Sequence, residues 1–378
     1  MIELGVDEFT LVFQPKRSIK DILWIKEALT IIGNIERTLH LKEIFGKRGY
    51  ENRAQAGYTN AFKYGEHDFY FAISYHEDFS IMGVCLKFSA RSLAYYTMKK
   101  SIKVYEILQK LESHLYSFRL SRIDFTADYL DEKICIKKLY QRYISKSVRI
   151  FQTVLKNNNE VTRVSNLKCK GYFNESDIET IYFGSEHSKT RLRVYNKKNE
   201  QLKNKGDYLD KAIKYDDWVR FEAIYKADDA HNITKELLGI NNDEEFLDII
   251  ANTMIQKFSF YHDGEMEHCT KLLYQCIIAK KIVLRRTNFI NNDLVGDVIY
   301  HYKNSGIVSF LQKINAIWGE KSLIEFSQYI NTISIERNEN KRCEEWLIKN
   351  KEEYKSSYKD FNDFIRRNKS IIDKYIVR

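Results

Sequence analysis

The stretch RLSRIDFTAD at residues 119–128 decides the fold, because its apolar and polar side chains alternate strictly. Successive side chains of a β-strand point to opposite faces, so Ile123, Phe125 and Ala127 share one face. The opposite face carries the polar set Arg122, Asp124, Thr126 and Asp128. The pattern therefore predicts a strand with one buried face and one polar face.

Two later stretches, TRLRVYN at 190–196 and DWVRFEAIYK at 217–226, repeat this alternation. Their polar faces carry Arg191, Arg193 and Tyr195 in the first and Arg220 and Glu222 in the second. If the three strands adjoin in one antiparallel sheet, a single face gathers carboxylates, arginines and a tyrosine. The alternative is that this face is simply the solvent-exposed side of a half-buried sheet.

The rest of the chain predicts an α+β fold. Further strands are expected at 5–13, 69–75 and 80–88, and helices at 17–32 and 92–114. From about Ala227 the pattern becomes helical and stays so to Arg378. We therefore expect a domain at 1–228 built on an antiparallel β-sheet packed with helices. A mostly α-helical C-terminal domain, 229–378, follows it, with a role in DNA recognition or dimerisation.

Composition limits the class of protein. The 378 residues carry a net charge of +9, with 44% hydrophobic and 14% aromatic residues, which indicates a folded protein that could bind a polyanion. No stretch approaches the roughly 20 apolar residues that span a bilayer, and the N-terminus lacks the pattern of a signal peptide. The six scattered cysteines favour reduced thiols, so we expect a cytoplasmic protein without membrane contact.

The polar face suits phosphoryl chemistry. Asp124, Asp128 and Glu222 offer the hard oxygen ligands that Mg²⁺ or Mn²⁺ prefers. Tyr195 could attack phosphorus and form a phosphotyrosine. Because a free tyrosine has a pKa near 10, it needs help to react at neutral pH. The cations that are close in sequence and could favour the phenolate and bind phosphate are Arg191, Arg193, Lys197 and Lys198.

At this point the chain resembles a known family. The blocks LSRIDFTADYLDEK (120–133), ETIYFGSEHSKTRLRVYNKKNEQLKN (179–204) and WVRFEAIYK (218–226) are similar to the Rep_trans replication initiation factors. That family includes initiators of rolling-circle plasmids and the related MOB-T relaxases of integrative conjugative elements. The similarity runs in order over roughly 119–226 and more loosely from residue 5.

The resemblance implies a site and a reaction. The family's nucleophilic tyrosine falls on Tyr195, and its metal-binding acids fall on Asp124 and Glu222, with Asp128 as a second acid of the same strand. It further implies nicking of one DNA strand at an origin, a 5′-phosphotyrosine product and a free 3′-OH primer. Expected partners are a host helicase and polymerase, and the protein could act as a homodimer.

Other residues are candidates for DNA contacts. Arg122, Arg220 and Lys198 could bind phosphate, and Ser185 and Ser188 lie in the turn that precedes the Tyr195 strand. An ordinary hairpin turn explains the two serines equally simply.

The basic insert at 133–170 interleaves cations with Tyr140, Tyr143 and Phe151, which suits single-strand binding. The alternative is an amphipathic helix whose tyrosines pack inward.

Three other functions remain open at this stage. A conjugative relaxase would use the same chemistry, whereas a non-catalytic origin-binding or repressor protein would need only the basic surface. A metal nuclease that uses water would leave a free 5′-phosphate. Tyr129 and Tyr182 are rival nucleophiles, although Tyr129 falls on the apolar side of its strand.

Overall fold

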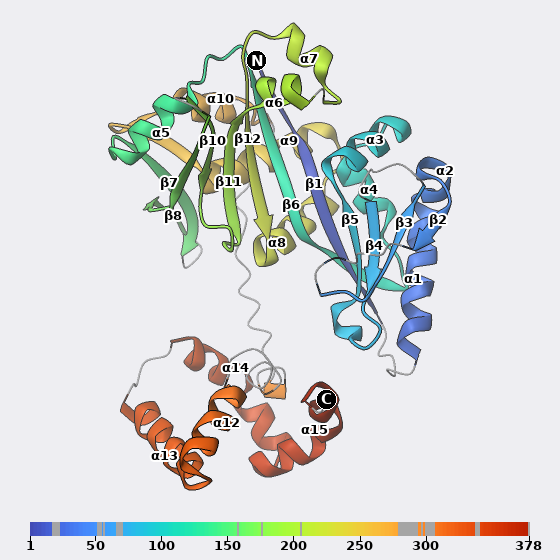
Figure 1. The fold of residues 1–378 in the computed structure, drawn as a ribbon, viewed down its shortest axis with the longest axis vertical. Helices are drawn as coiled ribbons and strands as arrows, with labels where there is room; N and C mark the ends of the chain where they lie inside the picture. The colour runs from blue at the N-terminus through green and yellow to red at the C-terminus, as the bar shows by residue number, and fades with distance from the viewer. Residues whose placement is uncertain are drawn as a thin grey trace. The chain divides into compact units, whose positions relative to one another are not determined.

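The computed structural model describes most of the chain (Figure 1). It covers all residues except 17–22, 51–54, 56, 66–70, 157–158, 175–176, 205, 279–293, 296–297, 299–306, 337–340 and 377–378. The chain divides into two compact units, Met1–Thr287 and Asn288–Arg378.

A ten-stranded antiparallel sheet forms the centre of the first unit, in the order β2-β3-β4-β5-β1-β6-β12-β11-β10-β9. Figure 1 shows these strands side by side, with β2 and β3 toward one edge and β10 toward the other. The strands are β1 (Ile2–Pro15), β2 (Arg48–Tyr50), β3 (Asn60–Tyr64), β4 (Phe71–Tyr75), β5 (Val84–Phe88), β6 (Tyr116–Leu130), β9 (Cys169–Asn174), β10 (Asp177–Phe183), β11 (Thr190–Asn196) and β12 (Trp218–Lys226). The predicted α+β fold on an antiparallel sheet is confirmed.

The three strands that the sequence singled out are neighbours. Strand β12 lies between β6 and β11, and its Glu222 pairs with Thr126 on one side and with Arg193 on the other. Directly opposite residues of an antiparallel pair point to the same face. The expectation that these strands share one polar face is therefore confirmed.

The opposite face of the sheet is the core. Phe125, Phe221 and Val194 are almost fully buried there. Among the helices that contribute buried residues to this core are α5 (Ile136–Ile144), α8 (Ala227–Leu238), α9 (Asp243–Lys257) and α10 (His268–Gln275).

Helices α8 to α10 follow residue 228, where the sequence suggested a domain boundary. They stay with the first unit because Ile233 and Ile250 are buried in the same core as the sheet. The compact unit therefore extends to Thr287, beyond the expected end of the first domain.

A second, four-stranded sheet runs in the order β14-β13-β7-β8. It is formed by β7 (Val148–Lys156), β8 (Asn159–Ser165), β13 (Ser259–His262) and β14 (Glu265–Met266). The expectation that the chain is helical throughout from Ala227 is wrong at β13 and β14. Phe260 explains the difference, because it is buried against Phe183 and Phe221 of the large sheet.

Several predicted elements have different bounds. The helix expected at 17–32 is α1 (Trp24–Thr38), and residues 17–22 lie outside the described chain. The strand expected at 80–88 begins with a 3₁₀ turn, η2 (Ser80–Met82), because Gly83 adopts a φ of 69° before β5 starts. The long helix expected at 92–114 is two helices, α3 (Ala90–Lys100) and α4 (Val104–Lys110). They separate at Ser101, whose φ is 51°.

Short helices complete the first unit: α2 (Leu41–Phe45), α6 (Lys197–Asn204) and α7 (Leu209–Lys214). Helix α6 begins directly after β11, and α7 precedes β12 by three residues. Lys197 of α6 lies over the Tyr195 ring and Lys211 of α7 lies 3.7 Å from Asp128, so both helices lie beside the polar face of these strands. A small apolar cluster of Leu130, Ala212 and Trp218 packs α7 on that face.

The second unit is helical where it is described. Its helices are α12 (Ile307–Trp318), α13 (Lys321–Glu336), α14 (Lys341–Ser357) and α15 (Phe361–Ile376). Phe310 and Phe326 join α12 to α13, with ring centroids 4.9 Å apart. Across both units, none of the described helices is long and apolar enough to cross a membrane.

Candidate active site

Tyr195 lies in the middle of the polar face, near the end of β11. Its hydroxyl donates to Glu222 Oε2 at 3.3 Å, and its side chain is only 4% exposed. The Arg193 guanidinium stacks over the Tyr195 ring at 4.1 Å and lies 3.6 Å from Glu222. Lys197, at the start of α6, places its ammonium 5.6 Å from the centre of the same ring. The predicted catalytic residues Arg193 and Lys197 thus lie against the Tyr195 ring, and Tyr195 and Arg193 also lie beside Glu222.

Burial dominates the electrostatics of this cluster. It raises the pKa of Tyr195 well above its usual value, and the charge of Glu222 adds to the effect, while Arg220 opposes it. Burial also raises the pKa of Glu222, and Asp7 is the neighbouring charge that contributes most. A phenol and a carboxyl with raised pKa values share one hydrogen bond, so the tyrosine is held protonated with an acceptor beside it.

Asp124 is paired with an arginine of its own strand. Both of its oxygens accept from Arg122, at 2.9 and 2.6 Å, and Arg122 also lies 2.9 Å from Glu8. Burial raises the pKa of Asp124 to about 7, with Glu222 and Glu8 adding to the shift and Arg122 opposing it. The predicted DNA contact Arg122 therefore binds carboxylates within the fold.

Asp128 is held in the same way from the neighbouring strand. Arg220 donates to both of its oxygens, at 2.7 and 2.8 Å, and these bonds keep the pKa of Asp128 below its usual value despite burial. Arg220 also donates to Asp7 at 2.7 Å. Arg220 thus links the predicted acid Asp128 to an acid that the sequence analysis did not single out.

The three predicted metal ligands are not brought to one point. Asp124 and Asp128 are four residues apart on one strand, which separates them by roughly 13 Å. Within the described residues, no group of three or more His, Cys, Asp or Glu side chains could hold a metal ion. Glu222 lies opposite Thr126, between the two aspartates, and Asp7 is the neighbouring carboxylate that raises its pKa most.

Asp7 occupies a β-bulge in β1. Val6 pairs with Phe125 and Glu8 with Asp124, so Asp7 is the extra residue with no partner across the strand pair. Bulges often re-aim a side chain next to a functional site. The signal in the sequence is the pair of consecutive acids, Asp7 and Glu8, which interrupts the alternation of apolar and polar residues between Val6 and Phe9.

Four other predicted site residues lie away from Tyr195 or are occupied elsewhere. Arg191 stacks over the Tyr182 ring at 3.9 Å, and Lys198 donates to the carbonyl of Tyr215 at 2.8 Å. The Ser188 hydroxyl donates to the carbonyls of Ser185 and Thr190, both at 2.7 Å, and so closes the turn before β11. Their roles in catalysis or DNA binding stay predictions.

The aromatic residues of the basic insert pack into the fold. The Tyr143 hydroxyl donates to the Leu167 carbonyl at 2.8 Å, and its ring packs edge-on against Phe183. Phe151 contacts Tyr261 in the second sheet. Tyr143, on helix α5, therefore fits the alternative of a helix whose tyrosines pack inward, whereas Phe151 lies on strand β7. Of the rival tyrosines, Tyr129 is buried with its hydroxyl on the Cys269 carbonyl, whereas Tyr182 lies on the polar face.

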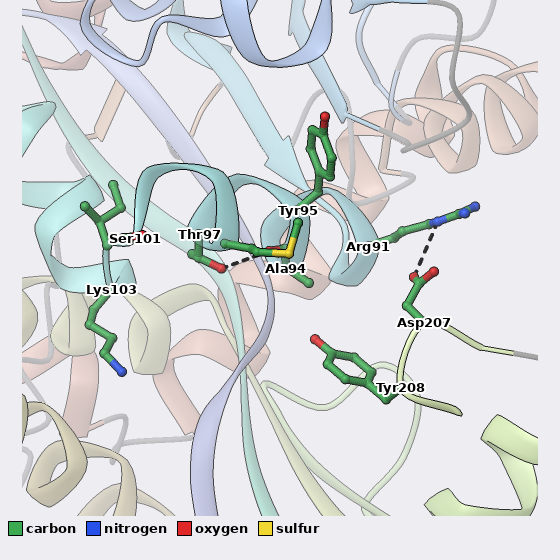
Figure 2. A pocket seen from close by; sticks show the side chains of 10 residues that line it. Arg91, Ala94, Tyr95, Thr97, Ser101, Lys103, Asp207 and Tyr208 are labelled. Carbon is green, nitrogen blue, oxygen red and sulfur yellow. Dashed lines mark hydrogen bonds and ion pairs between the residues drawn. The ribbon is translucent and has the colours of Figure 1, made fainter. Parts of the chain in front are cut away.

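Two adjoining cavities open beside the cluster. The first, of about 510 Å³, is lined by residues that include Asp7, Lys197, Arg220 and Tyr208. The second, of about 800 Å³, shares Tyr208 and continues along α3. Figure 2 shows Tyr208 facing α3 across this second cavity, with Arg91 and Asp207 paired at its rim. Solvent or a ligand can therefore approach the Asp7–Arg220 side of the site.

Comparison with known proteins adds the family. Residues 118–277 match the family model described as replication initiation factor, Rep_trans. No curated protein matches the chain. A solved structure similar to this chain is the rolling circle replication initiator protein from Geobacillus stearothermophilus. It is 15% identical with a TM-score of 0.49, over 75% of this chain and 100% of that chain.

The matched segment begins in β6, contains β11 and β12 with Tyr195 and Glu222, and ends after α10. Residues 118–277 are thus similar to the Rep_trans replication initiation factors.

Proposed function

We propose that this protein nicks one DNA strand at an origin with Tyr195 and starts rolling-circle-type replication. The observation that carries the proposal is the hydrogen bond from the Tyr195 hydroxyl to Glu222 beneath the Arg193 guanidinium. A nucleophile, a proton acceptor and a phosphate-binding cation thus occupy adjacent positions on neighbouring strands.

The reaction follows from these positions. The Tyr195 oxygen forms a bond to phosphorus as its proton passes to Glu222, and the bond from phosphorus to the 3′ oxygen breaks. The 3′ oxygen leaves with the electron pair and takes up a proton, so the net transfer is from the phenol to the new 3′-OH. The 5′ end remains attached to Tyr195 as a phosphodiester. The bond energy is kept, and the attack is reversible.

The cations around Tyr195 bind the phosphate. Arg193 is about one third exposed, so its guanidinium can reach a phosphate while it lies over the ring. Lys197 lies beside the same ring from α6, whereas Arg220, which pairs with Tyr195 across the strands, is engaged by Asp128 and Asp7. Guanidinium groups bind phosphate oxygens in pairs, which stabilises the charge that develops during transfer.

We further propose that Mg²⁺ or Mn²⁺ is bound by Glu222 and Asp7 rather than by Asp124 and Asp128. Both aspartates on β6 have their two oxygens engaged by arginines, whereas only one Asp7 oxygen accepts from Arg220. Ions that act on phosphates are commonly bound by one or two carboxylates, with water and the substrate completing the shell. A bound ion would neutralise charge on the phosphate.

The test uses the full chain and supercoiled plasmid carrying the DNA that surrounds its gene. The wild type should give a nicked circle with protein attached to the 5′ end after denaturation, and Tyr195→Phe should give neither. Tyr182→Phe is the matched control, because this tyrosine lies on the same face and pairs with Arg193 across the strands. It should still form the covalent adduct, because Tyr195 is intact, and this result would exclude Tyr182 as the rival nucleophile.

Other results would identify other functions. An adduct formed by Tyr195→Phe would exclude Tyr195 as the nucleophile. Nicking by the wild type with a free 5′-phosphate would indicate a nuclease that uses water. Origin binding without any nicking would indicate a non-catalytic DNA-binding protein. A relaxase uses this same chemistry, so the adduct does not distinguish replication from conjugative transfer. The two functions are distinguished by whether the nick lies at an origin of replication or at an origin of transfer.

A further inference from the structure

The polar face continues past Tyr195 to the edge of the large sheet. Tyr182 of β10 pairs with Arg193 on one side and with Lys170 of β9 on the other. Tyr172 of β9 pairs with Thr180, which in turn pairs with Tyr195. Because directly opposite residues share a face, Lys170, Tyr172 and Tyr182 lie on the same side of the sheet as Tyr195.

These side chains contact one another in a row. The Arg191 guanidinium stacks over the Tyr182 ring at 3.9 Å, and the Tyr182 and Tyr172 rings meet edge-on with centroids 5.6 Å apart. The Lys170 ammonium lies 4.6 Å from the centre of the Tyr172 ring. We call the row of Lys170, Tyr172, Tyr182 and Arg191 the tyrosine–cation ladder.

The ladder is accessible at its outer end. Tyr172 is 47% exposed on strand β9, the last strand of the sheet. Its chain neighbour Phe173 points to the opposite face, where it packs edge-on against Tyr140 of α5. Helix α5 therefore packs against the opposite face of the sheet at this edge and does not cover the ladder.

Alternating rings and cations match single-stranded nucleic acid. Bases stack on aromatic rings whatever their sequence, and lysine and arginine neutralise the backbone phosphates. From β11 to β9 the sheet extends two strand spacings, roughly 10 Å. At roughly 3.4 Å per stacked nucleotide, this gives room for about two or three nucleotides next to Tyr195.

We propose that the tyrosine–cation ladder binds the single-stranded DNA on one side of the scissile phosphate, with a base stacked on Tyr172. The inference rests on the proposed function for its position, because it places the ladder on the strand that Tyr195 cuts. Recognition by stacking is tolerant of sequence, so the ladder supplies affinity and holds the strand extended. Origin sequence is then read by other parts of the protein.

The test measures binding separately from nicking. Full-length protein is titrated into a fluorescein-labelled oligothymidylate of about twelve nucleotides, and anisotropy is recorded over a range of salt concentrations. Tyr172→Ala should weaken binding about 5- to 150-fold, the range for loss of one stacked base. Tyr172→Phe should bind like the wild type. Lys170→Gln should reduce the slope of log affinity against log salt by about 0.7, which corresponds to one phosphate contact.

Phe173→Ala is the matched control, because it removes an exposed ring from the same strand but from the opposite face. It should leave affinity within about twofold of the wild type. Unchanged affinity in Tyr172→Ala, or equal losses in Tyr172→Ala and Phe173→Ala, would overturn the ladder. Thermal unfolding of each variant verifies that it is folded.

The two proposals fail in different ways. If the protein forms the Tyr195 adduct but Tyr172→Ala binds the oligonucleotide normally, the ladder is wrong and the nicking mechanism stands. If no adduct forms but Tyr172→Ala loses affinity, the ladder stands as a single-strand site and the nicking mechanism is wrong. If both are right, Tyr172→Ala should raise the KM for nicking and leave kcat within a few-fold of the wild type.

Discussion

At the scale of single residues, burial favours the protonated forms of both the nucleophile Tyr195 and its proton acceptor Glu222. Burial raises the pKa values of Tyr195 and Glu222, and the hydrogen bond between them holds the phenol in place. The Tyr195 phenol does not attack phosphorus in this state, because it first has to lose its proton to a charged Glu222. A phosphate brought against Arg193, or a cation beside Glu222, would change that balance.

This electrostatic balance predicts the pH dependence of nicking. A raised carboxyl pKa means that the charged form, which alone accepts the Tyr195 proton, is lost as the pH falls. Nicking should therefore slow as the pH falls through the raised pKa of Glu222. Single-turnover nicking rates between about pH 5.5 and 9 would measure this limb.

Two variants test the assignment. Glu222→Gln cannot accept the proton, so its rate should be low and almost independent of pH. Asp124→Asn removes a neighbouring negative charge, so the midpoint of the remaining limb should move to lower pH. A wild-type rate that stays constant over this range, or a Glu222→Gln profile with the wild-type shape, would contradict Glu222 as the acceptor.

The sequence identified most of these residues because period two alone sorts Tyr195, Arg193 and Glu222 onto polar faces. It could not show that Asp124 and Asp128 are each held by an arginine, since such pairing depends on rotamers and on strand register. Asp7 was missed for a related reason. A bulge adds one residue to a strand without leaving a turn signal, so alternation alone does not reveal which side chain is re-aimed.

At the scale of elements, the bulge in β1 determines where Asp7 lies. Val6 and Glu8 already pair with consecutive residues of β6, Phe125 and Asp124. Removing Asp7 would therefore leave Val6 on the apolar face and Glu8 on the polar face, in a regular strand. The deletion therefore removes the Asp7 carboxylate and leaves the pairing of β1 with β6 intact.

We predict that deletion of Asp7 leaves the thermal unfolding midpoint nearly unchanged but weakens Mn²⁺ binding at least tenfold and abolishes metal-dependent nicking. Titration calorimetry with Mn²⁺ measures the binding. Asp7→Asn, which keeps the bulge, should show the same loss. If Asp124→Asn and Asp128→Asn lose Mn²⁺ instead, while the deletion binds it normally, the metal lies among the carboxylates that the sequence first suggested.

Helices were harder to predict than strands. The spacing of Leu93, Met98, Ile102 and Leu108 continues across α3 and α4, although the chain leaves the helix at Ser101. Serine is not a strong helix breaker, so its local propensity does not predict the left-handed conformation that separates α3 from α4. The sequence pattern therefore predicts that residues 92–114 are helical but not that they divide into two helices.

At the scale of the whole molecule, the change of sequence pattern predicts that the first domain ends at residue 228, whereas the compact unit extends to Thr287. The change from strands to helices at residue 228 is real, but α8 to α10 complete the core of the sheet. The family match, which ends at residue 277, includes the same helices. A change in secondary structure is thus a poor marker of a domain boundary when helices cover the face of a sheet.

The two boundaries predict opposite fates for truncated chains. A chain ending at residue 287 retains every residue of the main core, because all of them lie in Met1–Thr287. A chain ending at residue 228 loses Ile233, Leu237, Ile250 and Phe260, each of them at most 1% exposed in the full structure. At about 1.5–3 kcal/mol for each buried side chain, this loss is comparable to the roughly 5–15 kcal/mol that stabilises a typical domain.

We therefore expect residues 1–287 to unfold cooperatively in urea and to form the Tyr195 adduct on single-stranded oligonucleotides that carry the nick site. Residues 1–228 should be unfolded or aggregated, with little cooperative transition by circular dichroism. A folded, active 1–228 chain would show that α8 to α10 are dispensable and that the pattern change marks the true boundary. If 1–287 folds but fails to form the adduct, the second unit is required for the chemistry itself and not only for choosing the DNA.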